Sequence, residues 1–257
     1  MSFMMEKGES IAASLATKFA SNVIEKWTRY RAQNFFEEFQ HRLVEEHISG
    51  DQYIDVADDI DDILSDEKGS EVVYDAYRRV SLSSSKVIGP RIIGVLTAEL
   101  CIAKEYANDE YELFFSIAEM PNDRELVSVS KLVNEWFETK DTYDAKYKAG
   151  AAYVEDGCLK YVLDSSEVEI SSSAVSSSGV EISTDDLLEQ FGSELQKLRQ
   201  LGAVRINVQQ IIYHYHEDTE RYIDHDGTVQ ETIRLVYIPL KYRRIFDLIR
   251  KMSKKLG

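Results

Sequence analysis

The chain has 257 residues, which at roughly 100–200 residues per domain corresponds to one or two domains. Apolar residues make up 44% of the chain, so a packed core is expected and a wholly disordered chain is excluded. Its 30 basic and 46 acidic residues give a net charge of −16, which excludes a uniformly basic coat for nucleic acid.

The first residues, Met-Ser-Phe-Met-Met-Glu-Lys-Gly, lack the basic segment and apolar run of a secretory signal. The most apolar internal stretch runs from Val87 to Ala103, but Arg91 and Glu99 interrupt it, and a membrane span needs about 20 mostly apolar residues. The two cysteines, Cys101 and Cys158, form neither a disulfide framework nor a zinc-binding spacing. The sequence therefore predicts a cytoplasmic protein without a membrane span.

Helical periodicity covers the chain as far as about Lys148. An apolar face continues without Pro or Gly over 10–47, which predicts one long helix. Ser70 and Asp109 are expected to cap later helices, and Asn122 followed by Glu125 resembles a capping box. In all, five or six helices are expected; those after the first cover 51–67, 70–80, 90–103, 109–117 and 122–137.

The pattern changes after Gly150. Apolar runs at 151–154 and 159–163 flank Asp-Gly, a dipeptide typical of β-hairpin turns. Residues 164–183 contain nine serines, and two interpretations stay open: a flexible linker, or a short edge hairpin. The alternation of apolar and polar residues at 168–170 and 180–182 favours partial order with a mobile centre.

Residues 184–255 predict a helix, two strands and a last helix. Thr184 is expected to cap a helix that ends at Gly202, before strands at 203–215 and 228–238. The run Leu-Arg-Gln-Leu-Gly-Ala-Val-Arg-Ile that closes this helix, followed by a long hairpin, resembles the end of a winged-helix domain over about 184–240. The resemblance implies DNA recognition through the helix over 187–201.

The expected fold is α+β and mainly α. An N-terminal multi-helix domain with a long first helix covers 1–148. A short hairpin and Ser-rich connection covers 149–183. A winged-helix-like module, with a helix, a hairpin and a helix, covers 184–257.

Four aspartates, Asp55, Asp58, Asp59 and Asp62, share one face of a predicted helix. Like charges at this spacing repel unless a cation or a basic partner neutralises them. Three interpretations stay open: a solvated face, a contact for a basic partner segment, or an oxygen-ligand site for Mg²⁺ or Ca²⁺. The loop of an EF-hand is absent, so the solvated face is favoured and no cofactor is expected.

Three histidines, His214, His216 and His225, lie in or near the predicted hairpin. His214 and His216 share one face of a strand, and three neutral imidazoles can hold zinc or another transition metal. The favoured alternative is a polar turn whose histidines gain charge at about pH 6. Glu38 with His41 is a single Glu-x-x-His pair, whereas di-iron bundles use two such pairs.

A basic cluster, Arg78, Arg79, Lys86 and Arg91, lies around a predicted helix start, where an anion can bind. Residues 33–75 hold 14 acidic and 2 basic residues, a net charge of −12, so pairing of this cluster with acidic groups is favoured.

The last helix carries a second basic cluster, which includes Lys251, Lys254 and Lys255. A basic amphipathic helix can meet phosphates, anionic lipid or an acidic protein surface. Because the chain itself is acidic, nucleic acid is disfavoured as the partner and a protein is favoured.

Motifs for a nucleophile elbow, a phosphate loop, a dinucleotide turn and a zinc helix are all absent from the sequence, and no catalytic residue can be named. The leading hypothesis is a non-catalytic protein–protein interaction or regulatory subunit, which binds a partner or itself through the N-terminal helix. Such a subunit could belong to a bacterial stress or defence system, although no motif in the sequence indicates this. The alternatives are a winged-helix-like DNA-binding regulator and a metal-dependent enzyme that uses the three histidines.

Overall fold

The computed structural model describes residues 26, 28–46, 56–138, 149–170, 192–217 and 225–256. The chain divides into two compact units. The helical unit comprises the residues up to Leu126 together with Lys251–Gly257, and the sheet unit comprises Val127–Arg250. The two divisions fall inside the helices α6 (Asp123–Glu138) and α9 (Arg243–Ser253).

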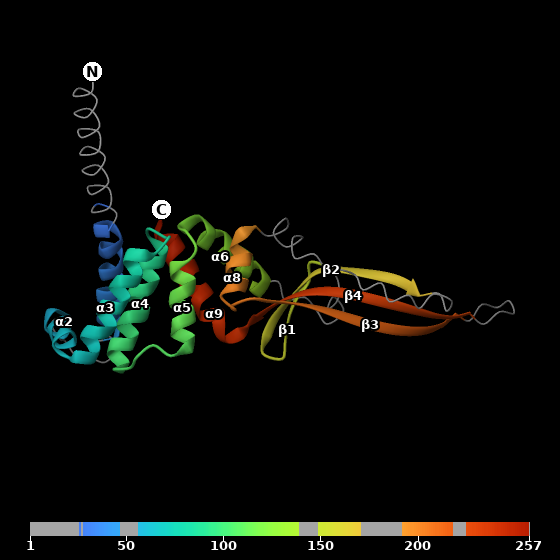
Figure 1. The fold of residues 1–257 in the computed structure, drawn as a ribbon, viewed down its shortest axis with the longest axis horizontal. Helices are drawn as coiled ribbons and strands as arrows, with labels where there is room; N and C mark the ends of the chain where they lie inside the picture. Colours follow the sequence, from blue (N-terminus) through green and yellow to red (C-terminus); the bar gives the residue numbers. More distant parts are fainter. Residues whose placement is uncertain are drawn as a thin grey trace, which may run out of the picture. The chain divides into compact units, whose positions relative to one another are not determined.

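The helical unit contains a helix over 28–46, followed by α2 (Val56–Ser65), α3 (Glu67–Leu82), α4 (Ile88–Ala103) and α5 (Asp109–Glu119). Helices α3, α4 and α5 lie side by side, with α4 between the other two (Figure 1).

The most apolar stretch of the sequence forms α4, the central helix of this unit. Its side chains Ile92, Ile93 and Leu96 are fully buried. A helix that is apolar on most of its circumference needs neighbours on several sides, and α4 has them in α3, α5 and the 28–46 helix. None of the helices in the described ranges is long and apolar enough to cross a membrane.

The 28–46 helix belongs to the core of the helical unit. Phe35, Phe39 and Leu43 are each at most 2% exposed. Gly94 of α4 permits the close approach of the two helices, because a Cβ at that position would collide with the carbonyl oxygen of Phe35. The predicted first helix is confirmed over 28–46, and its part before residue 26 lies outside the described residues.

Helix caps follow local side-chain chemistry, and two differ from prediction by a few residues. Helix α3 begins at Glu67 because Asp66, rather than Ser70, caps it by accepting from the Gly69 N–H (2.9 Å). Helix α5 is capped by Asn108, one residue before the predicted Asp109; its side-chain oxygen accepts from two N–H groups of the first turn.

The capping box at the start of α6 is confirmed in both directions. Asn122 N–H donates to the Glu125 carboxylate (2.8 Å), and Glu125 N–H donates to the Asn122 side-chain oxygen (3.1 Å).

The sheet unit contains one four-stranded antiparallel sheet with the order β1-β2-β4-β3. Its strands are β1 (Ala152–Glu155), β2 (Cys158–Ile170), β3 (Arg205–Glu217) and β4 (His225–Pro239). Helix α8 (Ser193–Gln200) precedes β3, and the short 3₁₀ turn η2 (Leu240–Tyr242) leads from β4 into α9. A second 3₁₀ turn, η3 (Lys254–Leu256), follows α9.

The core of the sheet unit forms at its β2–β4 centre. Ala151, Val162, Ile233 and Leu235 pack together there, and the rings of Trp136 and Tyr161 stack with centroids 4.3 Å apart. The turn between β1 and β2 is the predicted Asp156-Gly157, and both residues have positive φ (52° and 71°), as a two-residue hairpin turn requires.

The mainly α, α+β class is confirmed: a largely helical N-terminal part precedes a four-stranded antiparallel sheet and a C-terminal helix. The two predicted hairpins join in one sheet, because β2 pairs along β4 from Cys158 to Ile170. The helix expected from Thr184 to Gly202 does not run unbroken, because Gly192 has a positive φ (81°) and α8 begins after it at Ser193. Residues 171–191 lie outside the described part of the chain.

Candidate interaction site on the helical unit

Arg79, which the sequence placed in the basic cluster, is bound within the helical unit. Its guanidinium donates to both carboxylate oxygens of Glu112 (2.9 and 2.7 Å) and to Glu119 (3.1 Å), and it stacks 4.9 Å from the Phe115 ring. Burial opposes its charge, but the hydrogen bonds and charges of Glu112 and Glu119 prevail and raise the pKa of Arg79. The neighbouring Arg78 is exposed, with Asp75 at 3.7 Å.

The anion-binding position predicted at the start of α4 is filled by a carboxylate of the same chain. Asp123 accepts from the Ser85 hydroxyl (2.5 Å) and from the backbone N–H groups of Lys86, Val87 and Ile88 (2.9, 3.2 and 2.9 Å). These are the N–H groups that a bound anion would use at a helix N-terminus. Asp123 therefore joins the start of α6 to the start of α4.

Arg91 and Lys255 surround a buried carboxylate. Glu38 is 5% exposed, and its oxygen lies 2.5 Å from Lys255 Nζ and 4.0 Å from Arg91 Nε. Arg91 also donates to the side-chain oxygen of Asn34 (3.0 Å) and to the Lys255 carbonyl (3.3 Å). His41, whose pairing with Glu38 was considered for iron, is exposed and lies 3.4 Å from Glu45.

The other two lysines of the last helix are exposed. Lys251 lies 3.6 Å from Glu45 of the 28–46 helix, and Lys254 lies in the turn η3. Within the helical unit, members of both predicted basic clusters are thus paired with acidic groups: Arg78, Arg79, Arg91, Lys251 and Lys255.

The predicted acidic face is described in part. Asp62 is exposed on α2, and Asp58 and Asp59 lie on the same helix, with their side chains outside the described part. Asp55 lies outside the described residues. Binding of a cation or a basic segment at this face stays a prediction.

The three histidines lie on strands β3 and β4, where the backbone is described. His214 is opposite Thr228, His216 is opposite Asp226, and His225 is opposite Glu217. Their side chains lie outside the described part, so the metal hypothesis stays a prediction. Among the described residues, no group of three or more His, Cys, Asp or Glu is placed to hold a metal ion.

The Cys101 thiol and the Lys160 amine could serve as nucleophiles, but their surroundings keep both groups protonated. Burial, together with the charge of Asp66, raises the pKa of the Cys101 thiol to about 11, so little thiolate forms near neutral pH. Lys160 is 7% exposed, with Glu155 at 2.6 Å and Asp156 at 3.3 Å. Burial opposes its charge, but those carboxylates raise the pKa of Lys160, which keeps it an ammonium ion.

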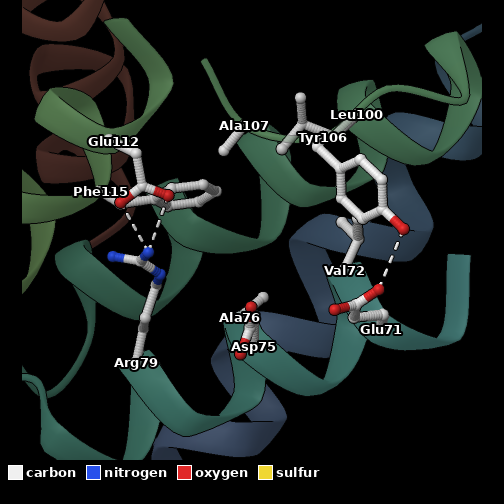
Figure 2. Close-up of a pocket in the computed structure, with 10 residues that line it drawn as sticks. All are labelled: Glu71, Val72, Asp75, Ala76, Arg79, Leu100, Tyr106, Ala107, Glu112 and Phe115. Atoms are coloured by element: carbon white, nitrogen blue, oxygen red, sulfur yellow. Dashed lines mark hydrogen bonds and ion pairs between the residues drawn. The ribbon is translucent and has the colours of Figure 1, made fainter. Parts of the chain in front are cut away.

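A hollow of about 170 Å³ lies between α3, α5 and the segment that joins α4 to α5 (Figure 2). We call it the α3–α5 hollow. Helices α3 and α5 each contribute both apolar and polar residues to its lining. Its lining residues are Glu71, Val72, Asp75, Ala76, Arg79, Leu100, Tyr106, Ala107, Glu112 and Phe115.

Two polar pairs mark opposite ends of the α3–α5 hollow (Figure 2). At one end Arg79 is bound to Glu112, and at the other the Tyr106 hydroxyl donates to Glu71 (3.0 Å). This hydrogen bond to Glu71 is the main reason that the pKa of Tyr106 is raised. Both pairs connect α3 to residues far along the chain, so the shape of the hollow depends on tertiary packing.

Beside the hollow, α3 exposes large apolar side chains. Tyr74 is 69% exposed and Leu82 is 74% exposed, and Tyr106 at the hollow is 55% exposed. Glu71, Asp75, Arg78 and Leu82 recur at i, i+4, i+7 and i+11, so they follow one face of the helix. We call the exposed row of Glu71, Tyr74, Asp75, Arg78 and Leu82 the α3 stripe.

A second hollow, of about 340 Å³, lies between the 28–46 helix, α2, α3 and α4. Leu43, Ile63, Cys101 and Ile102 are among its apolar lining residues, and Asp62 of the predicted acidic face is at its edge.

Comparison of the chain with protein-family models, with curated protein sequences and with solved structures found no match. The arguments on function therefore rest on the chain's own residues.

Several residues of the candidate site carried no signal in the sequence. Tyr106 and Glu112 lie outside every motif, and Tyr74 was part of a helix without an assigned face. Large apolar residues such as Tyr74 and Leu82, which stand among the polar residues of the helix in the sequence, could have pointed to the α3 stripe. The hollow itself required the tertiary arrangement.

Proposed function

We propose that this chain is a non-catalytic protein-binding subunit that docks its partner on the α3 stripe and the adjoining α3–α5 hollow. The observation that carries the proposal is the exposure of Tyr74, Leu82 and Tyr106, all more than half exposed, beside a preformed hollow. Exposed apolar residues rimmed by polar ones mark protein interaction sites, and aromatic residues are enriched at such interfaces.

The state of the charged and nucleophilic groups supports a binding role. Arg79, Arg91 and Lys255 are held by carboxylates of the helical unit, and Asp123 is used to join two helices. Cys101 and Lys160 are each held in the protonated form that does not attack a substrate.

The sequence predicted assembly through the N-terminal helix, whereas this proposal places the interface on the α3 stripe. The 28–46 helix has Phe35, Phe39 and Leu43 in the core of the helical unit. Deleting residues 1–48 would remove that core and lower the stability of the unit, so loss of assembly in such a deletion would not identify an interface.

The proposal is tested by placing a photo-crosslinking amino acid at Tyr74 in the full chain, expressed in its native host. The matched control carries the same group at Gln40, an exposed position of the 28–46 helix. We expect a discrete crosslinked species from the Tyr74 position and none from Gln40. Absence of any crosslinked species at Tyr74, or equal yields at both positions, would contradict the proposal.

A winged-helix-like DNA-binding role is a second candidate, supported by the order of elements in the sheet unit. Helix α8 ends before Gly202, and β3 and β4 follow as a long hairpin. Against it, α8 carries two basic residues, Lys197 and Arg199. Salt-dependent binding of duplex DNA by the full chain would favour this role, and no binding at low salt would reject it.

A further inference from the structure

Building on the proposed function, we infer that the α3–α5 hollow receives a single lysine or arginine side chain of the partner protein. The size of the hollow is the first argument. Ligand pockets usually measure about 300–1,000 Å³, whereas this hollow measures about 170 Å³. It therefore suits one side chain better than a cofactor or a drug-sized ligand.

The wall of the hollow suits the stem of such a side chain. Val72, Ala76, Leu100, Ala107 and Phe115 provide apolar contacts (Figure 2). Lysine and arginine bury their methylene groups against apolar surface while the charged end stays near polar groups.

The rim of the hollow has the complementary charge. Glu71, Asp75 and Glu112 line it, and Arg79 is the cation among the lining residues that the structure describes. The charge of Arg79 is already matched by Glu112 and Glu119. Glu71 accepts from the neutral Tyr106 hydroxyl, and Asp75 has an exposed arginine 3.7 Å away. A cation that enters the hollow is therefore attracted, and an anion is repelled.

The aromatic residues of the hollow already contact cations of this chain. Lys68 Nζ lies 4.6 Å from the centre of the Tyr106 ring, and the Arg79 guanidinium lies 4.9 Å from the centre of the Phe115 ring. These contacts show that both rings sit where a positive charge is tolerated next to an aromatic face. Because Arg79 covers the Phe115 ring, a partner's lysine or arginine would meet Tyr106, which is 55% exposed.

The test uses n-butylammonium, which reproduces the lysine side chain, added to the full chain labelled with ¹³C at its methyl groups. We expect saturable NMR shifts of the Val72, Ala76 and Ala107 methyl signals in the millimolar range. Butyrate, which has a carboxylate in place of the ammonium, is expected to leave them unchanged. Asp75→Asn is expected to weaken binding about two- to five-fold, the effect of losing one partly exposed charge pair.

The matched control is Asp61→Asn, which removes an exposed carboxylate on α2 outside the hollow and is expected to leave binding unchanged. The inference is overturned if n-butylammonium gives no saturable shift, if butyrate shifts the same signals, or if the two variants weaken binding equally. A chain that crosslinks a partner through Tyr74 but fails this test keeps the proposed function and loses the inference. A chain that fails the Tyr74 crosslinking loses both.

Discussion

Asp123 shows how a single carboxylate can fill a position that the sequence suggested for a bound anion. The sequence predicted the helix start and the anion-binding property of its N–H groups. It could not predict the occupant, because Asp123 is about 35 residues away from those groups and belongs to another helix.

We expect Asp123→Ala to lower the free energy of unfolding by about 2–3 kcal/mol, because a charged acceptor shared by several donors is lost. Urea denaturation of the full chain measures this. Asp109→Ala is the matched control, since Asp109 lies in the first turn of α5 and should contribute no more than about 1 kcal/mol through the helix dipole. Equal effects of the two substitutions would show that Asp123 acts only through the helix dipole.

Lys255 and Lys254 are adjacent lysines with different environments. Lys255 lies 2.5 Å from the buried Glu38, and Lys254 is exposed. Lys255→Ala removes a positive charge that neutralises the buried Glu38 carboxylate. We therefore expect this substitution to lower the free energy of unfolding by about 1–3 kcal/mol, and Lys254→Ala to lower it by less than about 0.5 kcal/mol. Similar losses in urea denaturation would contradict the assigned pairing.

The two cysteines are expected to differ in their reaction with a thiol-alkylating reagent. Because the pKa of Cys101 is raised to about 11, about one thiol in a thousand is ionised at pH 8, and the side chain is also buried. We expect Cys158, which is partly exposed, to be alkylated in the folded protein at pH 8, and Cys101 only after unfolding. Mass spectrometry of peptides from the labelled protein distinguishes the two sites.

The same pKa shift determines how Cys101 affects stability. The folded state holds the Cys101 proton more tightly than the unfolded state, whose thiol has a pKa near 9.0. The contribution of Cys101 is therefore fully present below pH 9 and is lost as pH rises through about 11. Rapid alkylation of Cys101 in the folded protein at pH 8 would show that the thiol is neither buried nor shifted.

At the scale of elements, the contact between α4 and the 28–46 helix depends on one glycine. In an exposed helix, Gly→Ala stabilises by up to about 1 kcal/mol. At Gly94 the added methyl group meets backbone atoms of Phe35 and Phe39, so we expect Gly94→Ala to destabilise by about 1–3 kcal/mol. Urea denaturation measures the change in the free energy of unfolding. A gain in stability would mean that the two helices are not in close contact.

Elements defined by local signals could be predicted from the sequence, and pairings between distant elements could not. The Asn122–Glu125 capping box and the Asp156-Gly157 turn depend on neighbouring residues, and both are confirmed. The joining of two predicted hairpins through β2 and β4 depends on residues 58 to 81 positions apart, for which a single sequence carries no register signal.

At the scale of the whole molecule, charge segregation along the sequence favoured pairing of charged groups within or between chains, but it did not identify the pairs. The acidic residues that hold Arg79 come from α5, and the one that holds Lys255 comes from the 28–46 helix. The candidate site could not be predicted for the same reason. Its hollow combines Glu71, Tyr106 and Glu112 from three parts of the chain, and none of them belongs to a sequence motif.

The central claim is that the α3 stripe binds a protein. It is tested most directly by native mass spectrometry of the full chain purified gently from its own host. We expect the unaltered chain to carry a stoichiometric protein partner or a second copy, and the Tyr74→Ser/Leu82→Ser variant to be free of it. Val154→Ser, which removes an exposed apolar residue of the sheet unit, should keep the partner. An unaltered chain that is a bare monomer, or a double variant that retains the partner, would contradict the claim.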